Sequence, residues 1–374
     1  MADTNYESLI GRADVNDLEA ILAITNSDVD AISHAVKSDF NSDFTWNYER
    51  SRPALSKLYE KAKTSQWNVT TDLDWSIDVD IEKVVLNNAE ANGRMFFQDN
   101  DLSHTSFGKW TEKEWTQLAI EGNNWTMSQF LHGEQGALLC TARIVETVPW
   151  IDAKYYASTQ VMDEARHVEV FSRYLNEKLD GHYPINAHLR MLLDDILMDS
   201  RWDMTYLGMQ IMVEGLALAA FGFMQQMTTE PLLKKLLRYV MSDEARHVAF
   251  GVLSLQEYYK ELSGAEIRER QEFAFEAAVR MRDRFLQQEV WERMGVPVKE
   301  ALELVLLDES RAQFQGLLFS KIVPNCKKLG LLDAGDGWLR ERFTEIGVIQ
   351  FEDWADTGEE YEALDEVAKD RASA

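Results

Sequence analysis

The chain contains one hexapeptide twice, and each copy places a glutamate and a histidine at a spacing that can bind a metal ion. The copies read Asp-Glu-Ala-Arg-His-Val and occupy residues 163–168 and 243–248, 80 residues apart. In each copy the glutamate and the histidine are three positions apart, so on a helix they share one face and can reach a common ion. A single Glu-x-x-His is common on helix surfaces, whereas two identical copies indicate a duplicated site.

A further glutamate precedes each copy by 30 residues: Glu134 stands before Glu164, and Glu214 stands before Glu244. The midpoints of these intervals, residues 149 and 229, coincide with a proline and with a Thr-Thr-Glu-Pro sequence, both of which favour a turn. Each pair therefore predicts a helical hairpin with arms of about 15 residues, or roughly 22 Å. Both carboxylates of a hairpin would end at the same height.

Long helical patterns position these residues. They cover about 111–147, 152–179, 185–199, 201–227, 231–261 and 264–295, and shorter helices follow to about 345. Before them, 53–67 is typical of an amphipathic helix, and 68–110 is typical mainly of loop with short helix. Thr228 or Thr229 is expected to cap the helix that begins at Pro231. The chain has only 6 prolines, about a third of the usual share, and no useful strand-like alternation, which favours an all-α protein.

Glu214 lies in an otherwise apolar run, Ile211 to Met224. A helix that is apolar all round is buried, and a buried carboxylate needs a cation, a hydrogen-bonding partner or a metal. No base stands within a helical turn of it, so the partner must come from elsewhere. Two packed hairpins would supply it, because they bring four glutamates and two histidines to one level. The alternative, a duplication without metal, leaves Glu134 and Glu164 exposed and Glu214 unexplained.

This set of residues matches the ligand formula of the di-iron and di-manganese carboxylate bundles, and four carboxylates neutralise two divalent ions. Residues 130–171 and 210–251 resemble the ferritin-like di-iron carboxylate superfamily, in its oxygen-activating branch. That branch includes bacterial multicomponent monooxygenase hydroxylase subunits, ribonucleotide reductase small subunits, acyl carrier protein desaturases and arylamine oxygenases. The resemblance implies a ferritin-like four-helix bundle core with additional N- and C-terminal helices.

The resemblance also implies roles for individual residues. Six metal ligands would act in catalysis through the metals, in two sets: Glu134, Glu164 and His167, and Glu214, Glu244 and His247, with Glu164 or Glu244 bridging. Asp163 and Asp243 would each hold the histidine of the opposite hairpin by a hydrogen bond. Arg166 and Arg246 would pair with these aspartates, the alternative being that they are solvated helix charges.

At several positions the residue differs from the one typical of a subfamily. Phe171 stands where ribonucleotide reductase subunits usually carry a radical tyrosine, which excludes a tyrosyl radical there. Ala217 and Leu218 replace the threonine of many monooxygenases and desaturases, and Val240 replaces the third histidine of arylamine oxygenases. The site is therefore the plain six-ligand form, and no subfamily matches cleanly.

Side chains one or two helical turns from the ligands are expected to line a substrate pocket, although bundle core is the alternative for each. They are mostly apolar, which suits oxidation of a hydrophobic small molecule in a dry site. The set is Phe130, Ala137, Leu138, Thr141, Val168, Phe171, Gln210, Ala217 and Phe221. The other histidines, His34, His104, His132, His182 and His188, are expected to be structural or at the surface.

The resulting hypothesis is a non-haem di-iron oxygenase or oxidase. It would activate O2 to hydroxylate, N-oxygenate or desaturate a small, largely apolar substrate, with electrons from a separate reductase or ferredoxin. The cofactor would be two iron ions, but oxygen and nitrogen ligands equally accept manganese or a mixed Mn/Fe pair. A ferroxidase or iron-handling protein and a di-manganese catalase are the alternative functions.

Charge and composition restrict the binding partners and the cellular location that we expect. Sixty-four acids against 38 bases give a net charge of −26, and residues 1–50 and 352–374 contribute −7 each. Such an acid excess disfavours binding to nucleic acid or to a membrane surface. Two cysteines, no signal-like N-terminus and no apolar run of about 18 residues favour the cytoplasm. A homodimer is compatible with the sequence.

We expect a single all-α domain over residues 1–374. It would comprise N-terminal helices and loops in 1–110, the metal-binding core in 111–262, and C-terminal helices with an acidic tail in 263–374.

Overall fold

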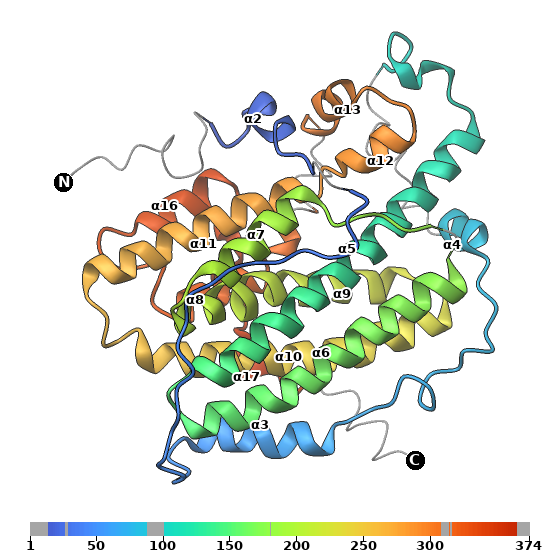
Figure 1. The fold of residues 1–374 in the computed structure, drawn as a ribbon. Coiled ribbons are helices and arrows are strands. Elements are labelled where there is room, and N and C mark those ends of the chain that lie inside the picture. Colours follow the sequence, from blue (N-terminus) through green and yellow to red (C-terminus); the bar gives the residue numbers. More distant parts are fainter. Residues whose placement is uncertain are drawn as a thin grey trace.

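Four long helical segments run side by side through the middle of the protein (Figure 1). The computed structural model describes residues 14–26, 29–87, 101–179, 181–307, 314 and 316–364. All regular elements within these ranges are helices, as predicted. The predicted acidic ends and the 68–110 loop lie partly outside the described residues, at 1–13, 88–100 and 365–374.

The first hairpin joins α5 (Glu112–Thr147) to α6 (Ile151–Lys178). A capping box fixes its start: the Thr111 side chain accepts from the backbone of the first turn, and Glu114 Oε2 accepts from the Thr111 N–H at 2.7 Å. The turn lies at residues 148–150, where the sequence predicted it. Along their length the two helices pack closely against each other.

The second hairpin joins a composite helix to α10 (Pro231–Tyr258). The composite helix consists of α8 (Trp202–Tyr206), the π-helical segment η4 (Leu207–Val213) and α9 (Glu214–Met227). The π-helical turns end directly before Glu214, and such wide turns occur frequently at functional sites.

The cap of α10 differs from the prediction. Neither Thr228 nor Thr229 is the N-cap; Glu230 is, and its carboxylate accepts from the N–H groups of Leu232 at 2.7 Å and Leu233 at 2.6 Å. Thr228 Oγ1 instead accepts from the Glu230 N–H at 3.2 Å. The threonine therefore shapes the turn, and the glutamate, directly before Pro231, caps the helix.

Further helices cover this core. The predicted helix over 264–295 is broken, because Gln287 adopts a left-handed conformation (φ 54°) between α11 and α12. Helix α3 packs along α6 and α10, and α11 packs along α7 and η4. The bounds are α2 (Leu18–Leu22), α3 (Pro53–Thr64), α4 (Ile81–Asn87), η3 (Ser106–Lys109), α7 (Ala187–Met198), α11 (Gly264–Arg284), α12 (Gln288–Arg293), α13 (Val298–Val305), α15 (Ile322–Lys328), α16 (Trp338–Glu345), η5 (Ile349–Phe351) and α17 (Thr357–Glu360).

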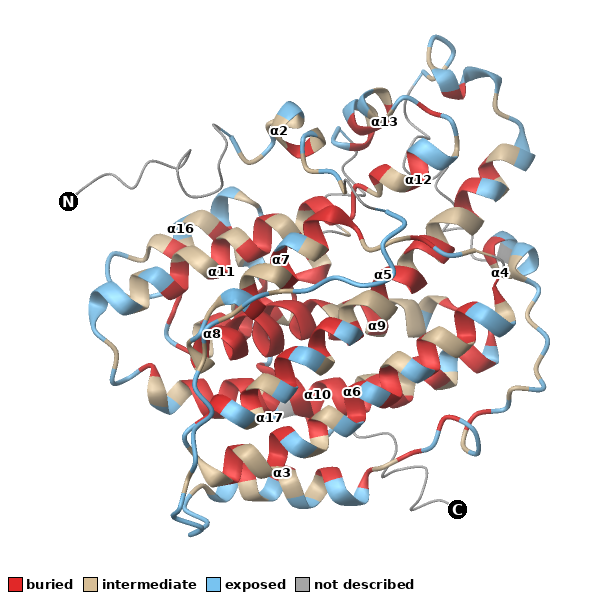
Figure 2. Ribbon diagram, viewed as in Figure 1, coloured by how far each residue is buried: buried red, intermediate tan, exposed pale blue. Residues whose placement is uncertain are grey.

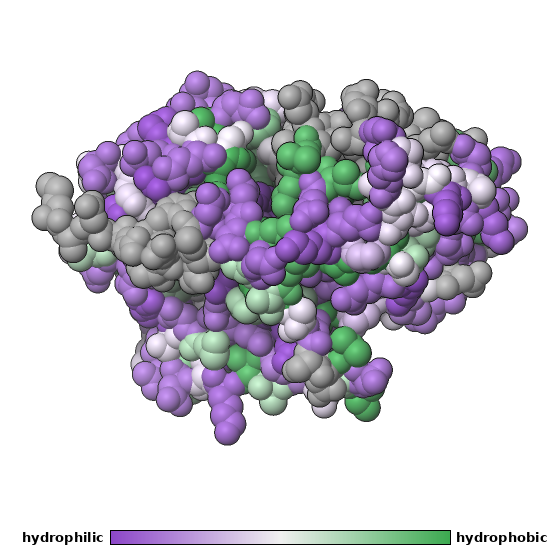
Figure 3. Space-filling view, turned by 90° about the horizontal axis from the view of Figure 1, so that it is seen from above, coloured by the Kyte–Doolittle hydropathy of each residue, from purple (hydrophilic) through white to green (hydrophobic). Residues whose placement is uncertain are grey.

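Burial is greatest in the composite helix and α10 (Figure 2). The segment Trp202–Met227 is long and apolar enough to cross a membrane, but 78% of its most apolar window is buried inside the protein. That burial is typical of a core helix. Figure 3 shows one face, mostly hydrophilic, with hydrophobic side chains gathered near its middle. The cytoplasmic location stays a prediction.

Gly251 on α10 provides a test of how closely the π-helical segment packs. A Cβ at residue 251 would lie 2.7 Å from Gln210 Cβ and 3.1 Å from Ile211 Cδ1. We expect Gly251→Ala to lower the free energy of unfolding by about 1–3 kcal/mol through overpacking. Gly222→Ala is the control, because its Cβ would meet only Met241 Cε at 3.4 Å, and it should be neutral or stabilising. Urea denaturation measures both; equal losses would contradict the packing argument.

Candidate metal centre

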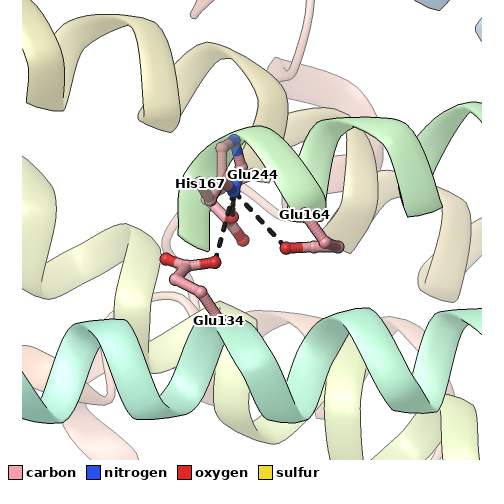
Figure 4. Close-up of side chains that lie close together, drawn as sticks. All are labelled: Glu134, Glu164, His167 and Glu244. Atoms are coloured by element: carbon pink, nitrogen blue, oxygen red, sulfur yellow. Dashed lines mark hydrogen bonds and ion pairs between the residues drawn. The ribbon is translucent and has the colours of Figure 1, made fainter. Parts of the chain in front are cut away.

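Six buried side chains from the two hairpins converge in the core. Potential ligand atoms form two overlapping groups, each with its atoms within 4.8 Å of one another. The first comprises Glu134 from α5, Glu164 and His167 from α6, and Glu244 from α10 (Figure 4); the second comprises Glu164, Glu214 from α9, and His247 from α10. None of the other histidines belongs to either group among the described residues. The structure thus brings together all six residues that the sequence singled out.

The two imidazoles share two carboxylates. His167 Nδ1 lies 3.2 Å from Glu134 Oε2, 3.4 Å from Glu164 Oε2 and 3.0 Å from Glu244 Oε1 (Figure 4). His247 Nδ1 lies 3.0 Å from Glu164 Oε1 and 3.6 Å from Glu244 Oε1. Glu164 and Glu244 therefore both stand between the histidines, in the bridging position. The sequence analysis left open whether Glu164 or Glu244 bridges, and both lie between the two imidazoles.

Several potential metal-ligand atoms of the cluster have no hydrogen-bond partner. Glu164 Oε2, Glu214 Oε2, both carboxylate oxygens of Glu244, and His247 Nδ1 are buried without a hydrogen-bond partner among the described residues. The approach of His247 to Glu164 is close in distance but lacks hydrogen-bond geometry. Buried polar atoms are nearly always paired, and oxygen and imidazole nitrogen atoms suit iron and manganese. The residues therefore fit a pair of divalent ions.

Electrostatics within the cluster are strongly coupled. Burial, helped by the charge of Glu244, raises the pKa of Glu134 to about 8, and burial raises the pKa of Glu214 well above its usual value. Burial raises the pKa of Glu164 as well, but the neighbouring His247 and His167 outweigh it, so the pKa of Glu164 is lowered. For both histidines the carboxylates outweigh burial and raise the pKa well above 6.5. Without metal, protons compensate part of the negative charge.

Each histidine is held by the aspartate of the opposite hairpin. Asp243 Oδ2 lies 3.1 Å from His167 Nε2, and Asp163 Oδ2 lies 3.4 Å from His247 Nε2. These contacts direct both Nδ1 atoms toward the carboxylates and fix the ring orientation. They are the contacts that the resemblance implied.

Two arginines hold the aspartates in turn. Arg166 Nη2 lies 2.5 Å from Asp163 Oδ1 and 2.9 Å from Asp243 Oδ2, and Arg246 pairs with Asp243 Oδ1. The side chain of Arg166 is 6% exposed and that of Arg246 is fully buried. The alternative of solvated helix charges is therefore wrong.

The sequence did not indicate three further members of this network. Gln160 Nε2 donates to Glu164 Oε1 and to Glu214 Oε1, both at 3.0 Å. Its position four residues before Glu164, on the same helix face, was an available signal. Trp67 Nε1 donates to Asp243 Oδ2 at 2.7 Å, and Gln66 Nε2 donates to Asp163 Oδ1 at 3.0 Å. The predicted helix 53–67 ends at Thr64, and these two side chains follow it.

A hollow lies beside the cluster, with Glu134, Glu214 and Glu244 in its wall. Four of the expected pocket residues line it: Phe130, Ala137, Ala217 and Phe221. Thr141, Phe171 and Gln210 are buried outside its lining, and Leu138 and Val168 are half-buried outside it. The remaining lining residues are Gln129, Gly133, Val213 and Arg284. Arg284 comes from α11 and was not anticipated.

Comparison with known proteins reveals a shared fold. No family model and no curated protein matches the chain. Among solved structures, a variant of an R2-like ligand-binding oxidase with an anaerobically reconstituted Mn/Fe cofactor aligns with a TM-score of 0.50 and 18% identity, covering 78% of this chain and 96% of that one. A second variant aligns with a TM-score of 0.46 and 19% identity, over 76% and 94%. The first alignment shows that this chain has the ferritin-like fold of that oxidase.

Protons and metal ions compete for the same atoms, which gives the centre a pH dependence. The pKa of Glu134 is raised to about 8 and the pKa values of both histidines are raised well above 6.5, so these groups hold protons that a metal ion must displace. We expect the affinity for Mn²⁺ to rise as the pH increases from 6 to 8, with proton release on binding. Calorimetry in buffers of different ionisation enthalpy counts those protons. An affinity independent of pH would contradict the assignment.

Asp243 is expected to position His167 rather than to bind metal. Asp243→Asn removes the charge that orients the imidazole and that pairs with Arg166 and Arg246. Metal affinity should fall about 10–100-fold. Asp353→Asn, the same change at an exposed site paired with Lys327, is the control and should bind metal normally. Competition with a chelator of known affinity measures both variants; an unchanged affinity in Asp243→Asn would refute the positioning role.

Proposed function

We propose that this chain is an O2-dependent di-metal oxidase or oxygenase acting on a small, largely apolar organic substrate. The observation that carries the proposal is the pair of overlapping ligand groups in a dry core, with unpaired carboxylate oxygens and an apolar hollow beside them. Glu134, Glu164, His167, Glu214, Glu244 and His247 would hold two ions. When bound, an iron pair or a mixed Mn/Fe pair supplies redox chemistry with O2.

The residues of the chain would bind the two ions, orient the ligands and exclude water from the site. Glu164 and Glu244 face both imidazoles and would bridge the ions, while Gln160 donates to Glu164 and Glu214 and so keeps these carboxylates in place. Phe130 and Phe221 form apolar walls with ring centroids 4.6 Å apart. Such walls exclude water from the site, which limits side reactions of the oxidant.

The overall reaction sets the need for a partner. Inserting one oxygen atom of O2 into a substrate and reducing the other to water consumes two electrons and two protons. A separate reductase or ferredoxin would supply the electrons, and the net charge of −26 favours a donor with a basic docking face. The shared fold with an R2-like ligand-binding oxidase that carries Mn/Fe supports the choice of metals.

The test is loading with ferrous ion under anaerobic conditions, followed by exposure to O2. We expect about two metal ions per chain and a new optical band on oxygenation. Glu164→Ala and Glu244→Ala should lose both, because each residue faces both imidazoles. Circular dichroism verifies that the variants remain folded.

Two results would overturn the proposal. One is the absence of an optical band together with unchanged metal content in both variants. The other is accumulation of many iron ions per chain, which indicates iron storage. Peroxide disproportionation by the manganese-loaded protein without a reductant would favour a catalase instead.

A further inference from the structure

A surface pocket lies beside the start of α8, at the end of the bundle that carries the turn between α5 and α6 (Figure 1). Its cavity volume is about 240 Å³. Five parts of the chain form its walls: residues 41–43, the end of α5, the start of α8, the end of α10 and the first two turns of α11. The lining residues are Asn41, Asp43, Thr147, Ser200, Arg201, Trp202, Asp203, Tyr258, Glu266 and Arg270. The pocket is therefore separate from the metal centre.

Both arginines in the lining of this pocket are already paired with carboxylates. Arg201 lies 2.7 Å from Asp199 and 2.8 Å from Glu269. Arg270 lies 3.0 Å from Asp203 and 2.9 Å from Glu269. Three carboxylates thus surround two guanidinium groups, so the arginines leave no positive charge to attract an anion.

Two further carboxylates line the pocket, Asp43 and Glu266. Neither has a cation at ion-pair distance in the part of the chain that the structure describes. Glu266 accepts from the Ser263 N–H at 2.8 Å as part of a helix cap. Lys154, on the neighbouring α6, directs its Nζ to two backbone carbonyl oxygens, at 2.8 and 3.1 Å. The pocket therefore has an excess of negative charge and favours a cation.

Aromatic rings in the pocket also suit a cation. The ring centroids of Trp202 and Tyr258, which both line it, are 4.6 Å apart, and the Trp150 ring centroid lies 5.0 Å from that of Trp202. The protein already places a cation on this cluster, because the guanidinium carbon of Arg52 lies 3.8 Å from the Trp150 ring centroid. Aromatic faces attract ammonium and guanidinium groups. Charge and rings thus point to the same kind of occupant.

A chain of packed rings leads from this pocket into the core. The ring centroids are 5.5 Å apart between Trp202 and Tyr206, 4.9 Å between Tyr206 and Phe250, and 4.4 Å between Phe250 and Tyr156. Tyr156 lies one helical turn before Gln160, which donates to two carboxylates of the metal site. The last three rings are fully buried. The pocket and the metal centre are therefore joined by continuous packing.

The metal centre lies too deep for direct contact with an electron donor. Its six convergent residues are at most 5% exposed. Electrons from a separate donor must therefore cross packed protein. Because electron transfer through protein weakens steeply with distance and with gaps in the packing, a continuous row of rings favours one route over others.

We propose that the electron donor docks at this pocket, with a lysine or arginine of its basic face inside, and that the rings from Trp202 to Tyr156 carry its electrons to the metal centre. The inference rests on the proposed oxidase function and specifies where its partner binds. Each transfer oxidises the donor by one electron and reduces the metal pair by one, and no bond forms or breaks. Two transfers supply the two electrons that the oxygenation consumes.

Methyl viologen is a suitable probe of the pocket, because it is a flat organic dication that carries one further electron when reduced. Calorimetry measures its binding to the metal-free protein and that of the bis-sulfonatopropyl viologen, which has the same rings and no net charge. We expect methyl viologen to bind more tightly, with an affinity that falls as salt increases. Asp43→Asn and Glu266→Gln should each weaken its binding about two- to fivefold.

Matched controls remove the same charges outside the pocket. Asp101 and Glu303 are exposed and do not line it. Asp101→Asn and Glu303→Gln should leave the binding of methyl viologen unchanged. Glutamine at residue 266 can still complete the capping box with Ser263, and the thermal midpoint verifies each fold. Equal weakening in pocket and control variants would show general attraction to an acidic protein and would overturn the docking site.

Stopped-flow mixing tests the route. The oxidised, iron-loaded protein is mixed anaerobically with the methyl viologen radical, and the loss of the radical's colour gives the rate of electron transfer. Tyr206→Leu interrupts the rings and should slow transfer severalfold, whereas Tyr206→Phe keeps the ring and should retain the parent rate. Tyr174→Leu is the control, since Tyr174 is equally buried but contacts Glu230 and lies outside the ring chain. Metal content verifies each variant.

The outcomes separate this inference from the proposed function. Viologen binding that is insensitive to both Asp43→Asn and Glu266→Gln overturns the docking site even if O2 reacts at the centre. Transfer that is slowed by Trp67→Phe and not by Tyr206→Leu overturns the route, because electrons then enter beside Asp243. Binding that depends on the two pocket carboxylates, in a protein whose loaded centre does not react with O2, supports the cation site and refutes only the oxidase.

Discussion

Four carboxylates buried at one level of a helical bundle are the constraint on which the rest of the structure depends. Glu134, Glu164, Glu214 and Glu244 are at most 5% exposed, so water screens little of their mutual repulsion. Without metal, the pKa values of Glu134, Glu214 and both histidines are raised, so protons take the place of cations there. Two divalent ions would neutralise all four carboxylates at once. The site is therefore built for binding cations and is a costly arrangement for any merely structural purpose.

The same charges tie the two hairpins together. His167 belongs to the first hairpin but contacts Asp243 of the second, and His247 makes the reciprocal contact with Asp163. Arg166 then bridges both aspartates. Together with side-chain packing, these crossed contacts fix the relative height of the hairpins. The network that orients the ligands is thus also the network that sets the register of the bundle.

The sequence predicted the elements whose signals are local and repeated. The hexapeptide copies, the 30-residue intervals and the turns near 149 and 229 sufficed for both hairpins and for all six convergent residues. It could not reveal partners that arrive from distant elements, such as Trp67 after α3 or Arg284 on α11, because no periodicity relates them to the site. It also missed the break at Gln287, a left-handed residue that is not glycine.

The duplicated core and the helices outside it contribute different features to the site. The four-helix core is internally duplicated, so it presents nearly equivalent side chains from both hairpins and gives the site no preferred direction. Direction requires something that breaks the two-fold pattern. Arg284 does so, because a single buried cation on α11 stands at one wall of the hollow and no symmetry-related cation opposes it in the lining. The helices outside the core thereby distinguish one side of the hollow from the other, while the core supplies the convergent carboxylates and imidazoles.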